Sequence, residues 1–291
     1  MKLVTFTHQD SRRIGVIDGD DVVGVGAADA SLPGDMLSLL EAGPSALETV
    51  HAASIGGPRI ALSDVRLEAP IARPPKFLGI GLNYADHVAE SGLETPAHPT
   101  AFNKQSTCIV GPYDDVHIPR ASSAIDYEGE LGFVIGRRCR HVSKEDAREV
   151  IAGYTIVNDV SVRDWQLRIP TWTIGKSFDT HGPIGPWIVT ADEVPDPHQL
   201  GLRTFVNDEL RQESNTKELI FDCFTLVEHL STAFTLEPGD IIATGTPSGV
   251  GIGMKPPQLL KAGDVVRIEI DGLGAIENRF IEEPADSAFI E

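Results

Sequence analysis

Two glutamates separated by one residue, Glu128 and Glu130, lead directly into the apolar run Leu131–Ile135. Successive side chains of a strand point to opposite faces, so these carboxylates share a face, and Asp126 is a candidate to lie beside them. Carboxylates held this close repel one another unless their pKa values rise or a cation binds between them. Ligand sets made only of oxygen favour Mg²⁺, Mn²⁺ or Ca²⁺ over zinc. The segment therefore predicts a metal site, and a solvated acidic strand edge is the alternative.

A third carboxylate, Asp159, stands just beyond the apolar run Tyr154–Val157, where a strand would deliver it to its end. With water and substrate, three carboxylates would complete an octahedral site. An aspartate at such a position is more commonly a turn or capping residue. Its assignment as a ligand therefore depends on the two glutamates.

A histidine and a glutamate, His87 and Glu90, lie three residues apart in a segment that follows the apolar run Phe77–Ile80. Asn83 can cap a helix of about two turns here, and Gly92 can end it, so the two side chains share one face. A carboxylate bonded to one ring nitrogen fixes the imidazole tautomer and makes the other nitrogen a better base. The pair could activate a water molecule, and an ordinary surface pair is the alternative.

Two loops carry further candidates. Gly175-Lys176-Ser177 resembles the end of a phosphate-binding loop, but Pro170 stands where that loop requires glycine, which excludes a nucleotide site. Lys176 instead offers a cation to a carboxylate or an enolate, unless it is a solvated loop residue. The loop from Thr244 to Gly251 could direct backbone amides at an anion, or it is simply a tight connection.

The elements that must position these residues are mainly strands. Residues 2–25 predict three antiparallel strands, residues 35–53 a helix interrupted at Gly43-Pro44, and Val65–Leu67 a further strand. Beyond Pro70 and Pro74-Pro75, apolar runs predict the strands Phe77–Ile80, Leu131–Ile135, Tyr154–Val157, Trp187–Val189, Leu202–Val206, Ile241–Thr244 and Val265–Ile270. Two helices are predicted there, Lys144–Ile151 with Ser143 as its N-cap, and Phe221–Phe234. This pattern favours a mixed β (α+β) fold with a small domain over residues 1–69 and a larger domain over residues 70–291.

Composition limits the partners. The 291 residues include 41% hydrophobic and 23% charged residues, as in a globular protein, and carry a formal net charge of −19. Such a surface repels nucleic acids and anionic membranes, so we expect neither as a partner, while a cleft that binds a metal can still accept a small anion. We see no signal peptide and no apolar stretch that could span a bilayer, and Cys108, Cys139 and Cys223 form no disulfide or zinc pattern. These features predict a cytoplasmic protein.

Taken together, the segments resemble the fumarylacetoacetate hydrolase family from about Phe77 to Phe280. The matching motifs are Gly81-x-Asn83-Tyr84-x-x-His87-x-x-Glu90, Glu128-x-Glu130, Asn158-Asp159-Val160-Ser161-x-Arg163-Asp164-x-Gln166, Lys176-Ser177-x-Asp179, Pro183-x-Gly185-Pro186 and Gly245-Thr246-Pro247-x-Gly249-Val250. The resemblance implies a β-roll core, a small amino-terminal α+β domain and a homodimer.

The same resemblance implies roles for individual residues. Glu128, Glu130 and Asp159 would bind Mg²⁺ or Mn²⁺. His87 and Glu90 would form a water-activating dyad on a lid, with Lys176 as a third catalytic residue. The residues expected to contact substrate or to support those that do are Tyr84, Arg163, Gln166 and Thr246.

The function expected from these groups is hydrolysis of a carbon–carbon bond in a small anionic, acylpyruvate-like 2,4-diketo acid. The metal would hold the 2-oxo acid end, the dyad would activate water, and the metal and Lys176 would stabilise the departing enolate. Three alternatives remain open at this point: decarboxylation of oxaloacetate, isomerisation of an unsaturated oxo-dioic acid, and a metal-stabilised β-protein without catalysis.

Overall fold

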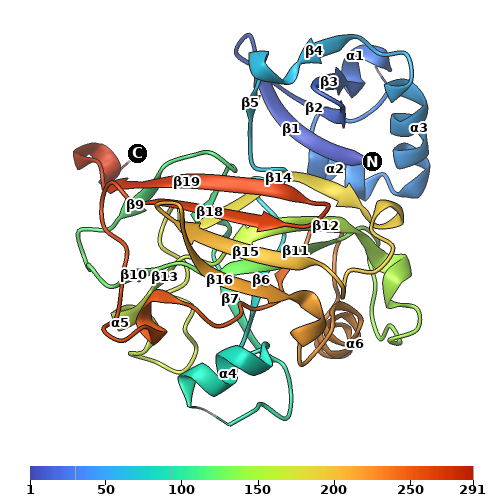
Figure 1. Ribbon diagram of the computed structural model, residues 1–291. Helices are drawn as coiled ribbons and strands as arrows, with labels where there is room; N and C mark the ends of the chain where they lie inside the picture. Colours follow the sequence, from blue (N-terminus) through green and yellow to red (C-terminus); the bar gives the residue numbers. More distant parts are fainter. Residues whose placement is uncertain (30, 93, 291) are drawn as a thin grey trace.

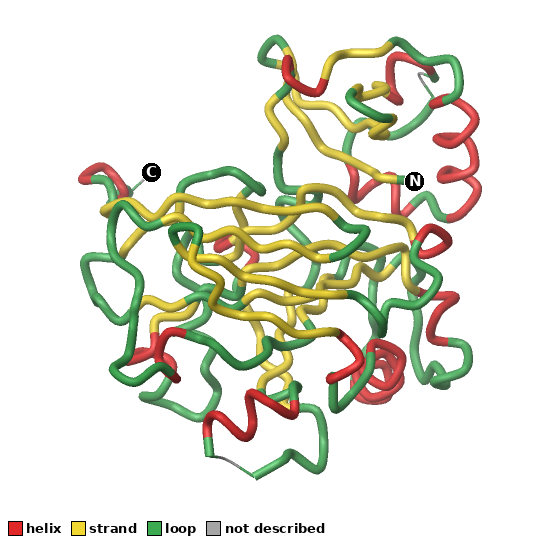
Figure 2. The backbone as a smooth tube through the Cα atoms, viewed as in Figure 1, coloured by secondary structure: helices red, strands yellow, loops and turns green. Residues whose placement is uncertain are grey.

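The computed structural model describes residues 1–29, 31–92 and 94–290, and the strands in these ranges form two large sheets and one short two-stranded pair. Helices are few, and Figure 2 shows them in red outside the yellow strands. The protein is a sheet-dominated α+β protein, which confirms the predicted class.

The amino-terminal unit begins with the three antiparallel strands predicted for residues 2–25. Its strands are β1 (Lys2–His8), β2 (Ser11–Asp18), β3 (Asp21–Gly24), β4 (Arg59–Ala61) and β5 (Arg66–Leu67), and its helices are α1 (Val25–Ala28), α2 (Met36–Glu41) and α3 (Pro44–Ser54). The predicted interruption at Gly43-Pro44 separates α2 from α3. Gly43 has a φ of +81°, and Pro44 lies in the first helical turn, where its missing N–H needs no partner.

The larger part contains the remaining strands and helices. Its strands are β6 (Phe77–Gly81), β7 (Thr100–Lys104), β8 (Ile109–Val110), β9 (Val116–Ile118), β10 (Ile125–Asp126), β11 (Gly129–Ile135), β12 (Ile151–Asn158), β13 (Ser161–Val162), β14 (Gly182–Thr190), β15 (Gly201–Val206), β16 (Glu209–Asn215), β17 (Ile241–Ala243), β18 (Val265–Ile270) and β19 (Gly274–Glu282). Its helices are α4 (Ala85–Ser91), α5 (Arg163–Gln166) and α6 (Cys223–Ala233). Every apolar run predicted as a strand here overlaps one of these strands, although Thr244 lies beyond the end of β17.

The two parts of the chain share one sheet. Within the described residues this sheet has 12 strands, with the order β4-β3-β2-β1-β14-β12-β11-β17-β6-β7 and with β5 beside β1 and β8 beside β14. β1 pairs antiparallel with β14, so that Leu3 lies opposite Ile188. In Figure 1 the amino-terminal unit, in blue, lies at the upper right of the larger part, and α4 lies at its opposite end. The division at residue 69 stays a prediction, and strand pairing runs across it.

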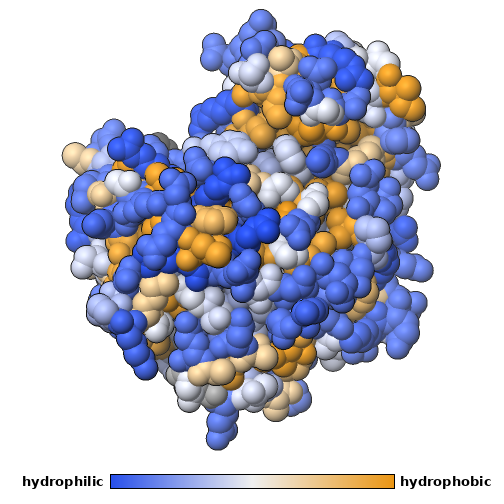
Figure 3. Space-filling view, viewed as in Figure 1, coloured by the Kyte–Doolittle hydropathy of each residue, from blue (hydrophilic) through white to orange (hydrophobic). Residues whose placement is uncertain are grey.

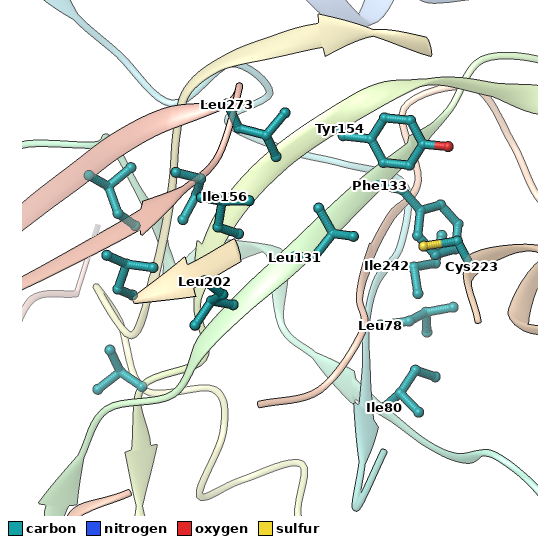
Figure 4. Packing of buried hydrophobic residues seen from close by; sticks show 14 of the residues in the cluster. Leu78, Ile80, Leu131, Phe133, Tyr154, Ile156, Leu202, Cys223, Ile242 and Leu273 are labelled. Carbon is teal, nitrogen blue, oxygen red and sulfur yellow. The ribbon is translucent and has the colours of Figure 1, made fainter. Parts of the chain in front are cut away.

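A second sheet packs against the first over the main core. In the part of the chain that the structure describes, it has five strands in the order β16-β15-β18-β19-β9. Figure 4 shows Leu131, Ile156 and Leu202 among the core residues between β11, β12 and β15. On the other face of the large sheet, Val134 and Val157 pack in the cluster that contains Leu3. Because β11 and β12 are buried on both faces, their sequences read as continuous apolar runs rather than alternating ones.

Two local predictions were wrong. The predicted helix Lys144–Ile151 is a short 3₁₀ helix at Ala147–Val150, because Ile151 already belongs to β12 and pairs with Ile135. Asn83 does not cap α4, since Tyr84 holds the N-cap position, whereas Gly92 ends the helix as predicted with a φ of +68°. The Asn83 amide instead donates to the carbonyl oxygens of Phe221 and Thr244. It therefore links the start of α4 to two distant segments.

The outer surface agrees with the charge of the chain. On the face shown in Figure 3 most residues are hydrophilic, and hydrophobic residues gather in patches over the amino-terminal unit and near its junction with the larger part. Among the helices of the described residues, none is long and apolar enough to cross a membrane.

Candidate active site

Strand pairing brings the three predicted metal ligands together. Glu128 precedes β11 and Asp159 follows β12, and these strands pair antiparallel with Gly129 opposite Asn158. The backbone N–H of Asp159 donates to the carbonyl oxygen of Glu128 at 2.9 Å. Carboxylate oxygens of Glu128, Glu130 and Asp159 all lie within 4.8 Å of one another, and the three side chains are buried. Asp159 follows Glu130 by 29 residues and Glu128 by 31 in the chain. The pleat and the antiparallel register of the two strands bring these acids together.

The three carboxylates are not equally compensated. Lys176 Nζ lies 2.7 Å from oxygens of both Glu128 and Asp159, and Arg163 Nη1 lies 2.6 Å from Glu128. Among the described residues no lysine, arginine or histidine forms an ion pair with Glu130, whose Oε2 accepts the Gly245 N–H at 2.7 Å. Burial, and then the negative charges of Asp159 and Glu128, raise the pKa of Glu130 well above its usual value. Burial also opposes ionisation of Glu128, but Lys176 and Arg163 outweigh it and lower the pKa of that carboxyl.

A buried lysine that the sequence did not reveal, Lys104, completes the charge pattern. Its Nζ lies 2.6 Å from Asp159 Oδ1 and also donates to the backbone carbonyls of His181 and Lys176. Burial alone would lower the pKa of Lys104, but the Asp159 carboxylate outweighs this and the net shift is upward. Lys104 ends β7, opposite Phe77 of β6, and only this strand pairing brings it to the site. A single lysine in a short, partly polar segment does not by itself indicate that its side chain is buried beside a carboxylate.

Asp126, the other acid predicted near the glutamates, lies outside the carboxylate cluster. Its oxygens accept Arg163 Nε at 2.9 Å and the backbone N–H groups of Gly251 and Ile252 at 2.8 and 2.9 Å. Arg163, at the start of α5, also donates from Nη1 to Gln166 Oε1 at 2.9 Å. Asp126 therefore holds Arg163 in place between two acids and a glutamine.

The loop from Thr244 to Gly251 does direct backbone amides at anions, and these anions are the protein's own carboxylates. Gly245 donates to Glu130, Gly249 to Glu90 and Gly251 to Asp126. Gly249 has a φ of +99°, and a Cβ atom there would lie 2.0 Å from the Arg211 carbonyl oxygen, so this position requires glycine. One loop thus positions a candidate ligand, a candidate dyad residue and the partner of Arg163.

α4 places the predicted dyad over the site. His87 Nδ1 lies 3.2 Å from Glu90 Oε2, and Glu90 Oε1 accepts the Gly249 N–H at 3.0 Å. Burial disfavours ionisation of Glu90, but the bonds from His87 and Gly249 outweigh it and lower its pKa. An ionised Glu90 carries no proton, so Nδ1 donates to it, and in the neutral imidazole Nε2 is then the nitrogen with the free lone pair. Asp86 Oδ2 accepts from the Ser248 hydroxyl at 3.0 Å and ties the same helix to the loop.

These groups surround a cavity of about 150 Å³. The predicted site residues that line it are His87, Glu128, Arg163, Gln166, Lys176 and Thr246. Thr246 donates its hydroxyl to the Gly129 carbonyl at 3.0 Å and accepts from Gln212 at 2.8 Å. Tyr84 is not in the lining, because its side chain is fully buried and its hydroxyl has no hydrogen-bond partner among the described residues. Its substrate contact stays a prediction that this geometry does not support.

The apolar wall of the cavity was not predicted. It includes Phe102 and Trp172, whose rings pack edge to face with centroids 5.8 Å apart, and Ile252. Trp172 lies in the stretch from Leu167 to Thr173, whose sequence offered little guidance and suggested only a role in specificity. A Cβ atom on Gly81 would lie 2.2 Å from this indole, so the close packing needs glycine at the end of β6.

The carboxylate cluster fits the predicted Mg²⁺ or Mn²⁺. It offers only hard oxygen donors, and Glu130 is a buried carboxylate without an ion-pair partner in the described chain, which a divalent cation would compensate. Besides Glu128 and the apolar wall, the lining of the adjacent cavity includes the cations Arg163 and Lys176, which could attract an anionic substrate. The arrangement can hold a cation, an anionic ligand and a base in one enclosed space.

Comparisons with known proteins agree with this geometry. Residues 76–281 match the family described as Fumarylacetoacetate (FAA) hydrolase C-terminal, and residues 1–70 match the family described as Rv2993c-like, N-terminal. The chain is 47% identical over 285 residues to the protein named oxaloacetate tautomerase fahd2, mitochondrial, from Xenopus laevis, which covers 96% of this chain and 89% of that protein.

Solved structures extend the similarity to the whole fold. Fumarylacetoacetate hydrolase from psychrophilic Exiguobacterium antarcticum has a TM-score of 0.86 and 37% identity, over 97% of this chain and all of that one. Maleylpyruvate hydrolase from Sphingobium sp. SYK-6, in complex with manganese(II) ion and pyruvate, has a TM-score of 0.81 and 34% identity, over 98% and 100% of the two chains. These matches confirm the expected α+β architecture and the resemblance on which it rested. The chain belongs to the fumarylacetoacetate hydrolase family.

Proposed function

We propose that the protein is a divalent-metal-dependent hydrolase that cleaves a carbon–carbon bond in an acylpyruvate-like 2,4-diketo acid, releasing pyruvate or a related 2-oxo acid and a carboxylic acid. The observation that carries this proposal is that His87, which is hydrogen-bonded to Glu90, lines the same cavity as Glu128 of the carboxylate cluster. A metal-stabilised β-protein without catalysis would need the acids but would have no use for a histidine–glutamate pair facing them.

The proposed ligands are Glu128, Glu130 and Asp159, and the proposed ion is Mg²⁺ or Mn²⁺. Such an ion would polarise the 2-oxo acid end of the substrate and stabilise negative charge that develops there. Support comes from the Sphingobium relative, whose structure contains manganese(II) and pyruvate. Arg163 and Gln166, already bonded to each other, offer donors for orienting the substrate carboxylate.

The chain's own groups account for the proton and the electrons. Nε2 of His87 removes a proton from water while Glu90 holds the imidazole, and the water oxygen bonds to the carbonyl carbon C4. The C3–C4 bond then breaks and its electron pair moves to C3 and the 2-oxo group as an enolate. The proton that His87 took from water transfers to C3, which completes the 2-oxo acid. Lys176 Nζ, a buried cation in the cavity lining, offsets the charge of that enolate.

A second candidate is interconversion of the keto and enol forms of oxaloacetate. It is favoured by the Xenopus relative, the protein named oxaloacetate tautomerase, with which the chain shares 47% identity. This reaction, like the decarboxylation and isomerisation considered above, needs a proton carrier and a stabilised enolate but no attacking water. The same dyad could move a proton at C3 without hydrolysis.

A direct assay separates the two candidates. Metal-stripped protein is reloaded with Mg²⁺ or Mn²⁺ and given acetylpyruvate or oxaloacetate. The proposal predicts stoichiometric pyruvate and acetate from acetylpyruvate, activity lost in chelator and restored by metal. Faster equilibration of oxaloacetate tautomers with no cleavage of any acylpyruvate would replace it with the tautomerase assignment, and pyruvate with carbon dioxide from oxaloacetate alone would indicate a decarboxylase.

Assembly and location belong to the same proposal. A homodimer and a cytoplasmic location are expected from the resemblance and the sequence, respectively. Light scattering on the purified protein tests the first, and a mass near one chain of 31.3 kDa would contradict it.

A further inference from the structure

A second cavity adjoins the first and is much larger. Its volume is about 510 Å³, against about 150 Å³ for the cavity beside the carboxylate cluster. The two cavities share His87, Leu167 and Ile252 in their linings. The outer chamber, as we call the larger cavity, is further lined by Glu90, Val250, Gly253, Met254, Lys255 and Pro257.

The dyad stands where the two cavities meet. His87 lines both, Glu90 lines only the outer chamber, and Glu128 and Lys176 line only the inner cavity. If His87 activates the attacking water, the carbonyl carbon that is attacked must lie at this boundary. The 2-oxo acid end then lies in the inner cavity, and the acyl group on the far side of that carbon extends into the outer chamber.

The walls of the outer chamber are mainly apolar. Leu167 and Ile252, at its rim, are 68% and 39% exposed, although large aliphatic side chains gain by being covered. The charged groups of the lining are Glu90, whose two oxygens already accept from His87 and Gly249, and the exposed Lys255. An anionic acyl group would lie beside the Glu90 carboxylate, whereas an aliphatic one would cover Leu167, Ile252 and Met254.

We infer that the outer chamber selects 2,4-diketo acids with an extended aliphatic acyl group, and that Leu167, Ile252 and Met254 determine this specificity. The inference rests on the proposed function, because it assigns the acyl side of the same substrate. An acetyl group would leave the outer chamber largely unfilled. Each methylene added to the acyl chain should raise kcat/KM by roughly three- to fourfold until the chamber is full, since burial of one methylene group is favourable by that factor.

Met254 is the best position for a test, because it lines only the outer chamber. Its sulfur accepts from Arg211 Nη1 at 2.8 Å, and Arg211 Nε has no hydrogen-bond partner in the described chain. Met254→Asp therefore places a carboxylate beside an existing cation and does not bury an unpaired charge. Ile169→Asp is the matched control, since Ile169 is 44% exposed in the loop after α5 and lines neither cavity.

The experiment measures binding and turnover separately. Calorimetry on the Mg²⁺-loaded protein compares pyruvate with 2-oxohexanoate and 2-oxooctanoate, which cannot be hydrolysed, and kinetics compare acetylpyruvate with hexanoylpyruvate. We expect affinity and kcat/KM to rise with chain length in the wild type and in Ile169→Asp, and the dependence to be nearly lost in Met254→Asp.

Two results would overturn the inference. One is a 2-oxo acid affinity of the wild type that does not change with the length of the acyl chain, or that rises with chain length equally in Met254→Asp. The other is tighter binding of 2-oxooctanedioate than of 2-oxooctanoate, which would assign the chamber to an acyl group ending in a carboxylate. If 2-oxo acid affinity depends on chain length as expected but no acylpyruvate is cleaved, the proposed hydrolysis fails and the specificity of the chamber stands.

Discussion

At the scale of single residues, the chemistry of the site follows from which charges are paired. Alternation along one strand is sufficient to predict that Glu128 and Glu130 share a face, and a second strand end is sufficient to suggest Asp159. Nothing in the sequence predicts Lys104, because its burial depends on the pairing of β6 with β7. Nor does local sequence distinguish Asp126, which binds Arg163, from the acids of the cluster.

Glu130 provides the sharpest test of the metal site. Loss of a residue that only supports a metal ligand typically lowers metal affinity by about ten- to a hundredfold. Glu130→Gln removes a proposed ligand itself, so Mg²⁺ or Mn²⁺ affinity should fall by more than about a hundredfold. Because it also removes a buried carboxylate with no ion-pair partner in the described residues, metal-free Glu130→Gln should melt no lower than the wild type. Calorimetric titration and thermal melts measure the two effects, with the exposed Glu145→Gln as the control. Unchanged metal affinity would remove Glu130 from the site.

The same carboxyl predicts a pH dependence. Burial, then Asp159 and Glu128, raise its pKa, so the folded metal-free protein holds this proton more tightly than the unfolded chain does. Metal must displace the proton, and metal affinity should fall as pH falls through the raised pKa. The stability of the metal-free protein should fall as pH rises above the ordinary glutamate value, since the folded state then binds more protons than the unfolded state. Metal-binding heats that are independent of buffer ionisation enthalpy would contradict this account.

At the scale of elements, the site is assembled by loops whose positions depend on glycine and on distant hydrogen bonds. Many strands were predictable from their apolar runs, and α6 lies within the helix predicted over Phe221–Phe234, where the structure adds Asp222 as its N-cap. Strands β4, β7 to β10, β13, β16 and β19 were not predicted, because they are brief or contain too many polar residues to form an apolar run. Asn83 was predicted to cap a helix, which is a common local role of asparagine. Its side chain instead forms three hydrogen bonds with the backbone of Phe221 and Thr244.

Gly249 connects loop geometry with the dyad. Gly249→Ala adds a Cβ atom 2.0 Å from a backbone oxygen at a φ of +99°, so the loop must shift and carry away the N–H that donates to Glu90. We expect kcat to fall tenfold or more, the size of a weakened general base. Gly263→Ala is the matched control, because its φ of +96° imposes about 1–2 kcal/mol of the same strain with nothing within 4 Å. Equal kcat values for the two variants would show that the loop does not position the dyad.

At the scale of the whole molecule, the amino-terminal unit supports the larger part through a shared sheet. Leu3 and Ile14 of this unit pack with Val134, Val157 and Ile188 in one buried cluster. The division of the chain near residue 69 was predicted from Pro70 and Pro74-Pro75, because prolines often mark a linker between domains. They do not record that β1 continues the sheet at β14, because strand order across such a distance depends on long-range pairing.

This continuity predicts the behaviour of a truncated chain. Residues 70–291 alone would expose the β14 edge and the apolar face that packs on Leu3 and Ile14. We expect aggregation, or a melting temperature well below that of the full chain with strong binding of an apolar dye. A monodisperse truncated protein with the melting temperature of the full chain would show that the two parts are independent domains.

The central claim is that His87, held by Glu90, activates the water that cleaves the substrate. The most direct measurement follows ¹⁸O from labelled water into the carboxylic acid released from an acylpyruvate, together with kcat, for the wild type and for His87→Ala. We expect one labelled oxygen per turnover in the wild type, and a loss of about 10²- to 10⁴-fold in kcat for His87→Ala with metal affinity nearly unchanged. Equal rates of labelled-acid release from the wild type and His87→Ala would contradict it.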